Sequence, residues 1–278
     1  MAITNFIPTV WSENLNKQLE KRYVAVANCS HEWEGEIKQY GDRVKICGLD
    51  PVSIFTYTKN SDLPAPATLS DTACELVINQ AKAFNFQIDD VDKAQTKPNL
   101  MDAAIRQAAD ALAASADRYV YRLAEHVDQS NVLELLGTSD DAVIDGIIDT
   151  ILNMQSKGVR EELILEVTPA VAGRLYKAKL DILSDNTSLF ESGCIGAIAG
   201  CKIFVSPYVL KINNGGADFN YCYLRTRRSI AFAEQLSEIE AYRPELRFAD
   251  AVKGLHLYGA KIVRPEELSV IKISTTAM

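Results

Sequence analysis

The chain has 278 residues, of which 47% are hydrophobic and 24% are charged, and its formal net charge is -8. This length suits one large domain or two modest ones, and no apolar run approaches the ~20 residues that span a bilayer. The acidic balance argues against broad electrostatic binding of nucleic acid, which needs Lys and Arg to displace counterions. The opening stretch MAITNFIPTVWSENL lacks a basic region followed by an apolar core, so we expect no secretory signal peptide.

The first thirty residues read as a small unit of their own. Within them, WSENLNKQLEKR predicts a short amphipathic helix, because Trp11, Leu15 and Leu19 recur every four residues on one narrow apolar stripe. Such a helix has too little apolar surface to stand alone. We therefore expect it to lie on the body of its own chain or on a neighbouring copy.

Residues 31–73 change character and predict a long two-stranded ribbon. DRVKICG and VSIFTYT are rich in strand-forming residues, and a Gly-Asp pair after EGEIKQY predicts a hairpin turn. The tip, KNSDLPAPATLSD, begins with Lys59 and has two prolines, and Leu63 is the only large apolar residue from Lys59 to Thr68. A lone ribbon of this kind is marginal in water, so Val44 and Ile46 need a partner surface.

The longest predicted element is a helix over residues 99–126, NLMDAAIRQAADALAASADRYVYRLAEH. Its alanines favour the helix, no Gly or Pro interrupts it, and Asn99 is a candidate N-cap. The larger apolar residues recur at steps of three and four and form one stripe. They are Met101, Ile105, Ala108, Leu112, Ala116, Tyr119 and Leu123. The charged residues, Asp117 among them, lie off this stripe. The alanines keep the helix thin, so other segments can lie close against it.

The middle third, residues 129–228, alternates helices and strands and predicts a compact α+β domain. Ser139 is the expected N-cap of a helix over DDAVIDGIIDTILNMQSK, and Thr168 with Pro169 opens a second helix. LILEV predicts a buried strand and GCIGAIAG a glycine-rich turn. The remaining residues, 229–278, include strand patterns such as LHLYGAKIV, which we expect to pack against the long helix.

No catalytic, cofactor or metal site is recognisable. The three histidines lie far apart, and neither Gly-x-Ser-x-Gly nor His-Glu-x-x-His occurs. The six cysteines form no Cys-x-x-Cys pair and are expected to be small buried residues. One basic cluster, Arg225, Arg227 and Arg228, could meet an acidic patch of another subunit or a phosphate. A solvated strand end fits the same residues equally well.

Three stretches together resemble the major capsid protein of tailed double-stranded DNA bacteriophages. They read LVINQAKAFNFQIDDVDKAQTKPNLMDAAIRQAADALA, GCIGAIAGCKIFVSPYVL and SIAFAEQLSEIEAYRPELRFADAVKGLHLYGAKIVRP. With the opening AITNFIPTVWSENLNKQLEK, the resemblance runs nearly end to end. It implies an α+β tailed-phage major-capsid fold, which herpesvirus capsid floors and bacterial encapsulins share. It also implies a structural protein without catalytic activity.

The resemblance further implies a division into four parts and a set of subunit contacts. The parts are an N-terminal arm, 1–30; an extended E-loop, 31–73, lying over the neighbouring subunit; a peripheral P-domain, 74–128 plus 229–278, with the helix 99–126 as its spine; and an axial A-domain, 129–228. The residues expected at contacts between subunits are Trp11, Leu15, Leu19, Val44, Ile46, Lys59, Arg225, Arg227 and Arg228.

The implied partners are further copies of the chain, which assemble as hexamers and pentamers into an icosahedral shell. The shell would enclose double-stranded DNA without tight sequence-specific binding, in a virion assembled in the host bacterial cytoplasm. Because the sequence opens directly on the arm, a separate scaffolding protein is implied, together with a portal protein and room for decoration proteins. No cofactor, metal ion or membrane is expected. One alternative is an encapsulin-type nanocompartment shell, and a cytosolic α+β enzyme is disfavoured.

Overall fold

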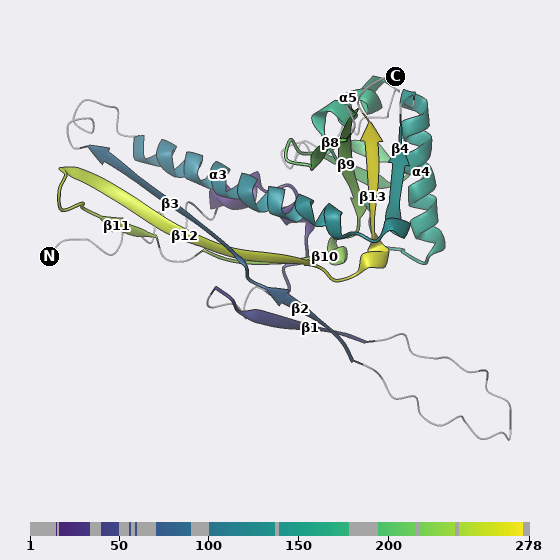
Figure 1. Cartoon of the computed structure of the whole chain (residues 1–278), viewed down its shortest axis with the longest axis horizontal. Coiled ribbons are helices and arrows are strands. Elements are labelled where there is room, and N and C mark those ends of the chain that lie inside the picture. Colours follow the sequence, from purple (N-terminus) through teal and green to yellow (C-terminus); the bar gives the residue numbers. More distant parts are fainter. Residues whose placement is uncertain are drawn as a thin grey trace.

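The computed structural model describes residues 15, 17–33, 40–49, 56, 59, 71–89, 100–136, 139–177, 194–214, 217–236 and 239–274. A long helix, α3 (Leu100–Arg122), lies along an extended sheet, and a second sheet flanked by helices stands at one end of it (Figure 1). This mixed α+β architecture is the predicted class. Within the described ranges, no helix combines the length and apolar character needed to cross a bilayer.

The extended sheet has four strands and is centred on β12 (Ala249–Ile262). Antiparallel to it run β10 (Ile230–Leu236), β11 (Glu240–Tyr242) and β3 (Gln80–Asp89). From Ala83 to Asp89 of β3, burial alternates residue by residue, and Phe84 and Phe86 pack against the core beneath α3. The alternation matches the predicted strand, because successive side chains of a strand point to opposite faces.

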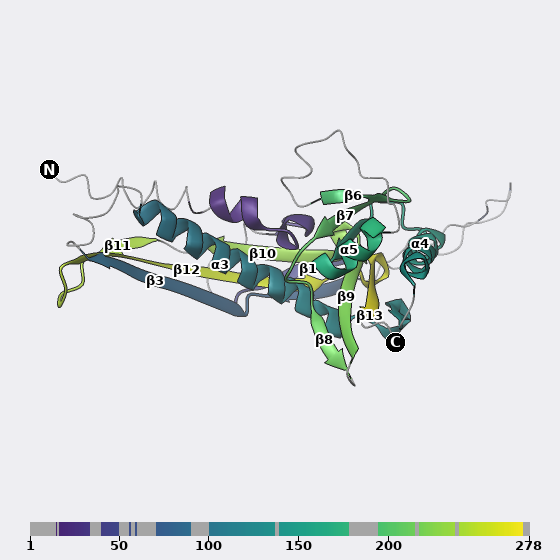
Figure 2. The same cartoon turned by 90° about the horizontal axis from the view of Figure 1, so that it is seen from above.

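Helix α3 is buried along more of its circumference than the predicted stripe. Ile105, Leu112 and Ala116 of the stripe are buried as expected, and residues of a second face are buried too. These are Ala109, Ala113, Asp117 and Val120. One face of α3 packs on the four-stranded sheet and the N-terminal segment lies along its side, so both faces are covered (Figure 2). The helix ends at Arg122, and the 3-10 turn η3 (Leu123–His126) completes the predicted range; the proposed N-cap Asn99 lies outside the described residues.

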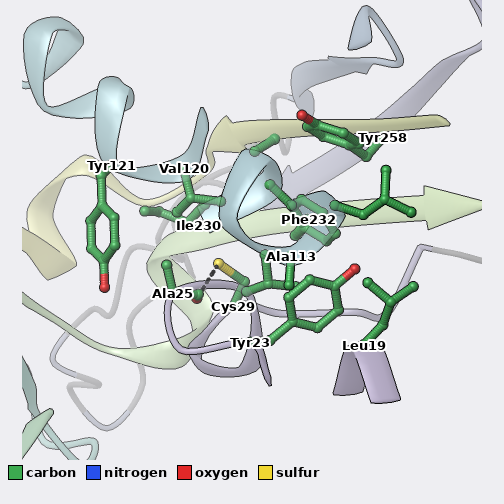
Figure 3. Close-up of a cluster of buried hydrophobic side chains, with 14 of the residues drawn as sticks. Leu19, Tyr23, Ala25, Cys29, Ala113, Val120, Tyr121, Ile230, Phe232 and Tyr258 are labelled. Atoms are coloured by element: carbon green, nitrogen blue, oxygen red, sulfur yellow. Dashed lines mark hydrogen bonds between the residues drawn. The ribbon is translucent and has the colours of Figure 1, made fainter. Parts of the chain in front are cut away.

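The N-terminal segment covers the second buried face of α3. Residues 17–22 are helical and are followed by the 3-10 turn η1 (Val26–Asn28). Leu15, Leu19 and Tyr23 belong to the same buried cluster as Ala113 of α3 and Phe232 of β10. Figure 3 shows Leu19, Tyr23, Ala113 and Phe232 gathered in this cluster. The predicted amphipathic helix therefore packs on the body of its own chain.

The second sheet has seven strands in the order β4 (Val132–Leu135), β13 (Leu268–Ser274), β9 (Ala217–Arg225), β5 (Ile164–Val167), β7 (Cys201–Val205) and β6 (Cys194–Ile198), with β8 (Lys211–Asn214) paired to β9. Helices α4 (Asp140–Ser156) and α5 (Pro169–Lys177) flank it. Their predicted N-caps are present: Ser139 Oγ accepts from the Ala142 N–H, and Thr168 Oγ1 from the Val171 N–H, at 3.3 Å each. Three further 3-10 turns are η4 (Gln129–Asn131), η5 (Arg227–Ser229) and η6 (Pro265–Glu267).

Two predictions about these strands were wrong. The stretch predicted as a glycine-rich turn is mostly strand β6, and only Ala199 and Gly200, both with positive φ, form the turn into β7. The last strand, β13, was placed with the long helix but pairs with β9 and β4 in the seven-stranded sheet. All but one of its residues are buried, which is the pattern of a central strand covered on both faces.

The base of the ribbon is a two-stranded antiparallel sheet, as predicted. Strand β1 (Arg43–Leu49) pairs with β2 (Asp71–Val77), so the boundary expected between residues 73 and 74 falls inside a strand. Figure 1 shows this pair beneath one end of the four-stranded sheet, against which it packs. Residues 34–39, on one side of the predicted hairpin turn, lie outside the described ranges, as does most of the ribbon tip.

One glycine marks where the ribbon crosses the four-stranded sheet. A Cβ atom built on Gly259 of β12 would lie 2.3 Å from the carbonyl oxygen of Val77 and 3.2 Å from Cα of Ile78. Because both obstacles are backbone atoms, no side chain can move aside.

Gly259→Ala should lower the free energy of unfolding by about 1–3 kcal/mol, measured by urea denaturation. Gly173→Ala is the control: its Cβ would meet open space in α5, so the change should stabilise the chain by up to about 1 kcal/mol. Equal effects of the two changes would contradict the close crossing.

Candidate functional site: subunit-contact surfaces

Four of the apolar residues predicted at subunit contacts are buried inside their own chain. Leu15 and Leu19 are 0% and 3% exposed and belong to the buried cluster that includes residues of α3. Val44 and Ile46 are 2% and 4% exposed, and they pack in a cluster that includes Leu76, Ile78, Ala231, Ala233 and Leu257. The prediction was wrong for these four side chains, because a periodic apolar stripe shows that burial is needed but not which surface provides it.

Arg225 was predicted at a contact as part of a basic cluster, and it is fully buried instead. Its guanidinium forms a two-pronged ion pair with Glu166 of β5, with Nε to Oε2 at 3.1 Å and Nη2 to Oε1 at 2.9 Å. Burial alone would lower the pKa of Arg225, but the adjacent Glu166 carboxylate outweighs it and raises the pKa further above its ordinary value. Arg225 is therefore a charged core residue and not a surface for another subunit.

The remaining donors of Arg225 bind the N-terminal segment. Nη1 donates to the carbonyl oxygen of Asn28, and Nη2 to that of Ala25, both at 2.8 Å. The Asn28 side-chain amide donates in turn to Glu166 Oε1 at 2.9 Å. A planar guanidinium has five donors in a fixed fork, and here they bridge a strand of the seven-stranded sheet and the N-terminal segment. Glu166 was missed, although a glutamate inside the apolar strand LILEV was a signal that it had a buried partner.

Asp117, which the sequence pattern placed off the apolar stripe of the long helix, is a second buried ionisable residue. It is 0% exposed, and its Oδ2 and Oδ1 accept from the backbone N–H groups of Val24 and Val26 at 3.1 Å each. Burial raises the pKa of the Asp117 carboxyl to about 7, although the Val26 and Val24 donors work in the opposite direction. A carboxylate pointing from a helix into two backbone donors acts as an anchor for the segment that carries them.

The rest of the predicted contact residues are exposed or lie outside the described ranges. Lys59, Arg227 and Arg228 are exposed, and Arg228 pairs with Glu161 on the surface. Trp11 lies outside the described residues. Thus Lys59, Arg227 and Arg228 stay available to a neighbouring copy, and their predicted role is untested.

Exposed apolar side chains form a set of candidate contacts that sequence reasoning missed. Leu246 and Phe248 are 96% and 85% exposed in the loop between β11 and β12. Other large apolar side chains with high exposure are Tyr40, Leu136, Leu152 and Tyr176. Two such side chains at one loop tip are a stronger signal than scattered single residues. The signal was present in the sequence as RPELRF, whose Leu-x-Phe spacing interrupts a charged stretch.

Neither a metal centre nor a reactive cysteine stands out. Among the residues that the structure describes, no three His, Cys, Asp or Glu side chains gather as a metal site. Cys29, Cys194, Cys201 and Cys222 are buried free thiols, as predicted, whereas Cys74 is only half-buried. Burial raises the pKa of Cys201 and Cys222 to about 12. An open hollow of about 640 Å³ lies where β2, the end of α3 and β12 meet. Its lining mixes apolar and charged side chains.

Comparisons with known proteins find the same architecture in bacteriophage capsids. Neither a protein-family model nor a curated protein sequence matches the chain. The capsid of Ralstonia phage GP4 aligns over 93% of this chain and 91% of its own, with a TM-score of 0.73 and 13% sequence identity. A chain of Mycobacterium phage Che8 aligns over 90% of both chains, with a TM-score of 0.66 and 23% identity. The chain has the bacteriophage capsid fold.

This fold is also present in a virus-like particle from Pyrococcus furiosus, which aligns over 93% of this chain with a TM-score of 0.52 and 14% identity. In each of these three alignments, 90% or more of both chains is covered, so the capsid fold accounts for nearly the whole chain. The α+β major-capsid fold implied by the sequence resemblance is confirmed.

Proposed function

We propose that the protein is the structural subunit of a bacteriophage capsid, whose copies assemble as hexamers and pentamers into an icosahedral shell around double-stranded DNA. The observation that carries the proposal is the alignment of nearly the whole chain with phage capsid subunits at TM-scores up to 0.73. In a closed shell, one set of contacts is repeated by symmetry. The protein has no catalytic role in this proposal.

The parts of the fold take their names from this proposal. The four-stranded sheet with α3 as its spine is the P-domain, the seven-stranded sheet with α4 and α5 is the A-domain, and the β1–β2 ribbon is the base of the E-loop. The A-domain then includes β13 in addition to the predicted residues 129–228. The E-loop extends to the end of β2 at Val77.

Assembly inside the host cytoplasm, with a scaffolding protein and a portal protein, belongs to the same proposal, as does the final place of the chain in a virion. Confinement in the shell, and not tight binding, holds the genome, because a net charge of -8 offers few phosphate contacts. An encapsulin-type shell is less well supported, since most of the solved structures that align with this chain come from phages, GP4 and Che8 among them.

Sedimentation and electron microscopy test the proposal directly. The full-length protein, alone and co-expressed with the scaffolding protein of its own genome, should form closed particles of megadalton mass. Particles produced during infection should contain duplex DNA. A chain that stays a dimer or tetramer under every condition would refute the shell, and particles filled with a protein cargo would favour the nanocompartment.

We propose that the loop between β11 and β12 forms a contact between subunits, because it carries the two most exposed large apolar side chains, Leu246 and Phe248. Changing both Leu246 and Phe248 to Ser should reduce the yield of closed particles at least tenfold, because buried apolar anchors dominate interface energies. The free energy of unfolding of the subunit should change by less than about 0.5 kcal/mol, since both side chains are exposed.

Arg247→Ser in the same loop is the matched control. Its side chain is exposed between the two apolar residues, and an exposed charge at the rim of an interface contributes little. Particle yield from sedimentation should therefore stay near that of the unchanged protein. Normal assembly of the Leu246, Phe248 double variant would remove this loop from the contact surface.

A further inference from the structure

A segment of eight residues contacts both sheets and the long helix at once. We call this segment, residues 23–30, the strap. Its first contact is with α3, where the N–H groups of Val24 and Val26 donate to the two oxygens of Asp117. Asp117 is fully buried, so this contact is shielded from water and from screening by salt.

The second contact of the strap is with the four-stranded sheet. The Ser30 N–H donates to the carbonyl oxygen of Ile230, and Ser30 accepts from the Phe232 N–H, at 2.9 Å each. Tyr23 at the other end donates its hydroxyl to Glu234 Oε2 at 2.6 Å. The strap is thus tied at both ends to β10, the edge strand of this sheet.

The third contact is with the seven-stranded sheet, through the buried pair of Arg225 and Glu166. Arg225 holds the carbonyl oxygens of Ala25 and Asn28, and Glu166 accepts from the Asn28 amide. Arg225 is the last residue of β9, and the chain passes from it through η5 directly into β10. The contact therefore sits where the backbone crosses from one sheet to the other.

We propose that the strap is a clamp between the two domains: by binding α3, β10 and the Arg225–Glu166 pair together, it fixes the angle between the four-stranded and seven-stranded sheets. Three short connections cross between the sheets, before β4, after β9 and before β13. Backbone connections of this kind limit the distance between two domains but leave rotation possible. Apolar side chains of both sheets also share one buried cluster, which includes Val270 and Phe232. To this non-directional contact the strap adds buried, directional hydrogen bonds on both sides of the crossing, which fix the angle.

Arg225 is a positioning residue in this clamp, and Arg225→Lys tests it in the full-length, unassembled chain. A lysine keeps the positive charge beside Glu166, but one ammonium group cannot reproduce the planar fork that also holds two carbonyl oxygens. Two readouts are needed. One is hydrogen–deuterium exchange of the strap amides, and the other is the distance between spin labels at Lys82 of β3 and Asp145 of α4, both exposed. Labels attached through an unnatural ketone residue leave the cysteines untouched.

The expected result is local. The amides of Val24, Val26 and Ser30 should exchange at least ten times faster, while amides of β5 and α4 change less than twofold. The distance distribution between the labels should broaden. Tyr223→Phe is the matched control, because it removes a buried bond between the same two units, from the Tyr223 hydroxyl to the Tyr121 carbonyl oxygen at 2.7 Å, without touching the strap. Strap exchange should not change in that variant.

Two results would overturn the proposal. One is an unchanged distance distribution in Arg225→Lys despite fast strap exchange, which would show that the sheets hold their angle without the strap. The other is equal acceleration of strap, β5 and α4 amides, which would make Arg225 an ordinary core residue. If Arg225→Lys does not fold, Asn28→Ala replaces it: this change removes only the side-chain bond to Glu166 and should give a smaller shift in the same two readouts. The test uses single chains, so its outcome is independent of shell assembly.

Discussion

Arg225→Met should lower the free energy of unfolding by about 3–5 kcal/mol, the largest single-residue effect that we expect in this chain. The change leaves the Glu166 carboxylate buried without its partner, and an uncompensated buried charge is strongly destabilising. It also removes the Arg225 donors from the carbonyl oxygens of Ala25 and Asn28. Urea denaturation of the unassembled subunit measures the effect.

Two controls identify the cause. Arg228→Met changes an arginine three positions further on, whose ion pair with Glu161 is exposed, and should alter the unfolding free energy by less than about 1 kcal/mol. Arg225→Met combined with Glu166→Met removes both buried charges and should recover a large part of the loss. If the double variant is no more stable than Arg225→Met alone, the unpaired Glu166 carboxylate does not cause the loss of stability.

The second large effect is a pH dependence that runs opposite to that of an ordinary carboxylate. The pKa of Asp117 is about 7 in the folded chain, against an ordinary value of 3.8, mainly because burial disfavours the charged form. Between these two pH values the folded chain keeps the proton and the unfolded chain releases it. The contribution of Asp117 to stability is therefore complete below about pH 4 and is lost as pH rises to about 7, by up to ~1.4 kcal/mol per pH unit.

Asp117→Asn isolates this contribution, because other carboxylates titrate in the same range. The difference in unfolding free energy between the unchanged protein and Asp117→Asn should shift in favour of the variant as pH rises from 5 to 7, by up to about 3 kcal/mol. At pH 5 the variant should be the less stable of the two by about 1–3 kcal/mol, since its amide group has one acceptor oxygen for two backbone donors. A difference that does not vary with pH would mean that Asp117 is charged throughout.

Local signals predicted the elements of this fold well. Ser139 and Thr168 mark the starts of α4 and α5, because a hydroxyl at an N-cap satisfies donors within its own first turn. The alanine-rich run predicts α3, and the alternation of Phe84 and Phe86 predicts β3. In each case the interacting residues are close in sequence, so a short stretch of sequence contains both of them.

Contacts between residues far apart in the sequence were predicted poorly, and most of the errors fell on the residues expected at contacts between subunits. Leu15, Leu19, Val44 and Ile46 were assigned to neighbouring copies because no local segment could cover them. Their partners lie on α3 and on strands of the four-stranded sheet, far away in the sequence. The sequence analysis also failed to predict that Leu246 and Phe248 are exposed. Whether an apolar residue is exposed depends on which surfaces the rest of the chain leaves uncovered.

The sequence by itself determined the class of the fold, the long helix and most strands, because periodicity and capping are properties of neighbouring residues. Only the tertiary structure decided the sheet to which β13 belongs and the burial of Asp117, Glu166 and Arg225. A charged side chain in a sequence reads as solvated, because burying it alone is prohibitively unfavourable. It becomes a core residue only when segments more than fifty residues apart supply its counter-charge and hydrogen-bond donors, as the strap and β5 do for Arg225. That arrangement exists only in three dimensions.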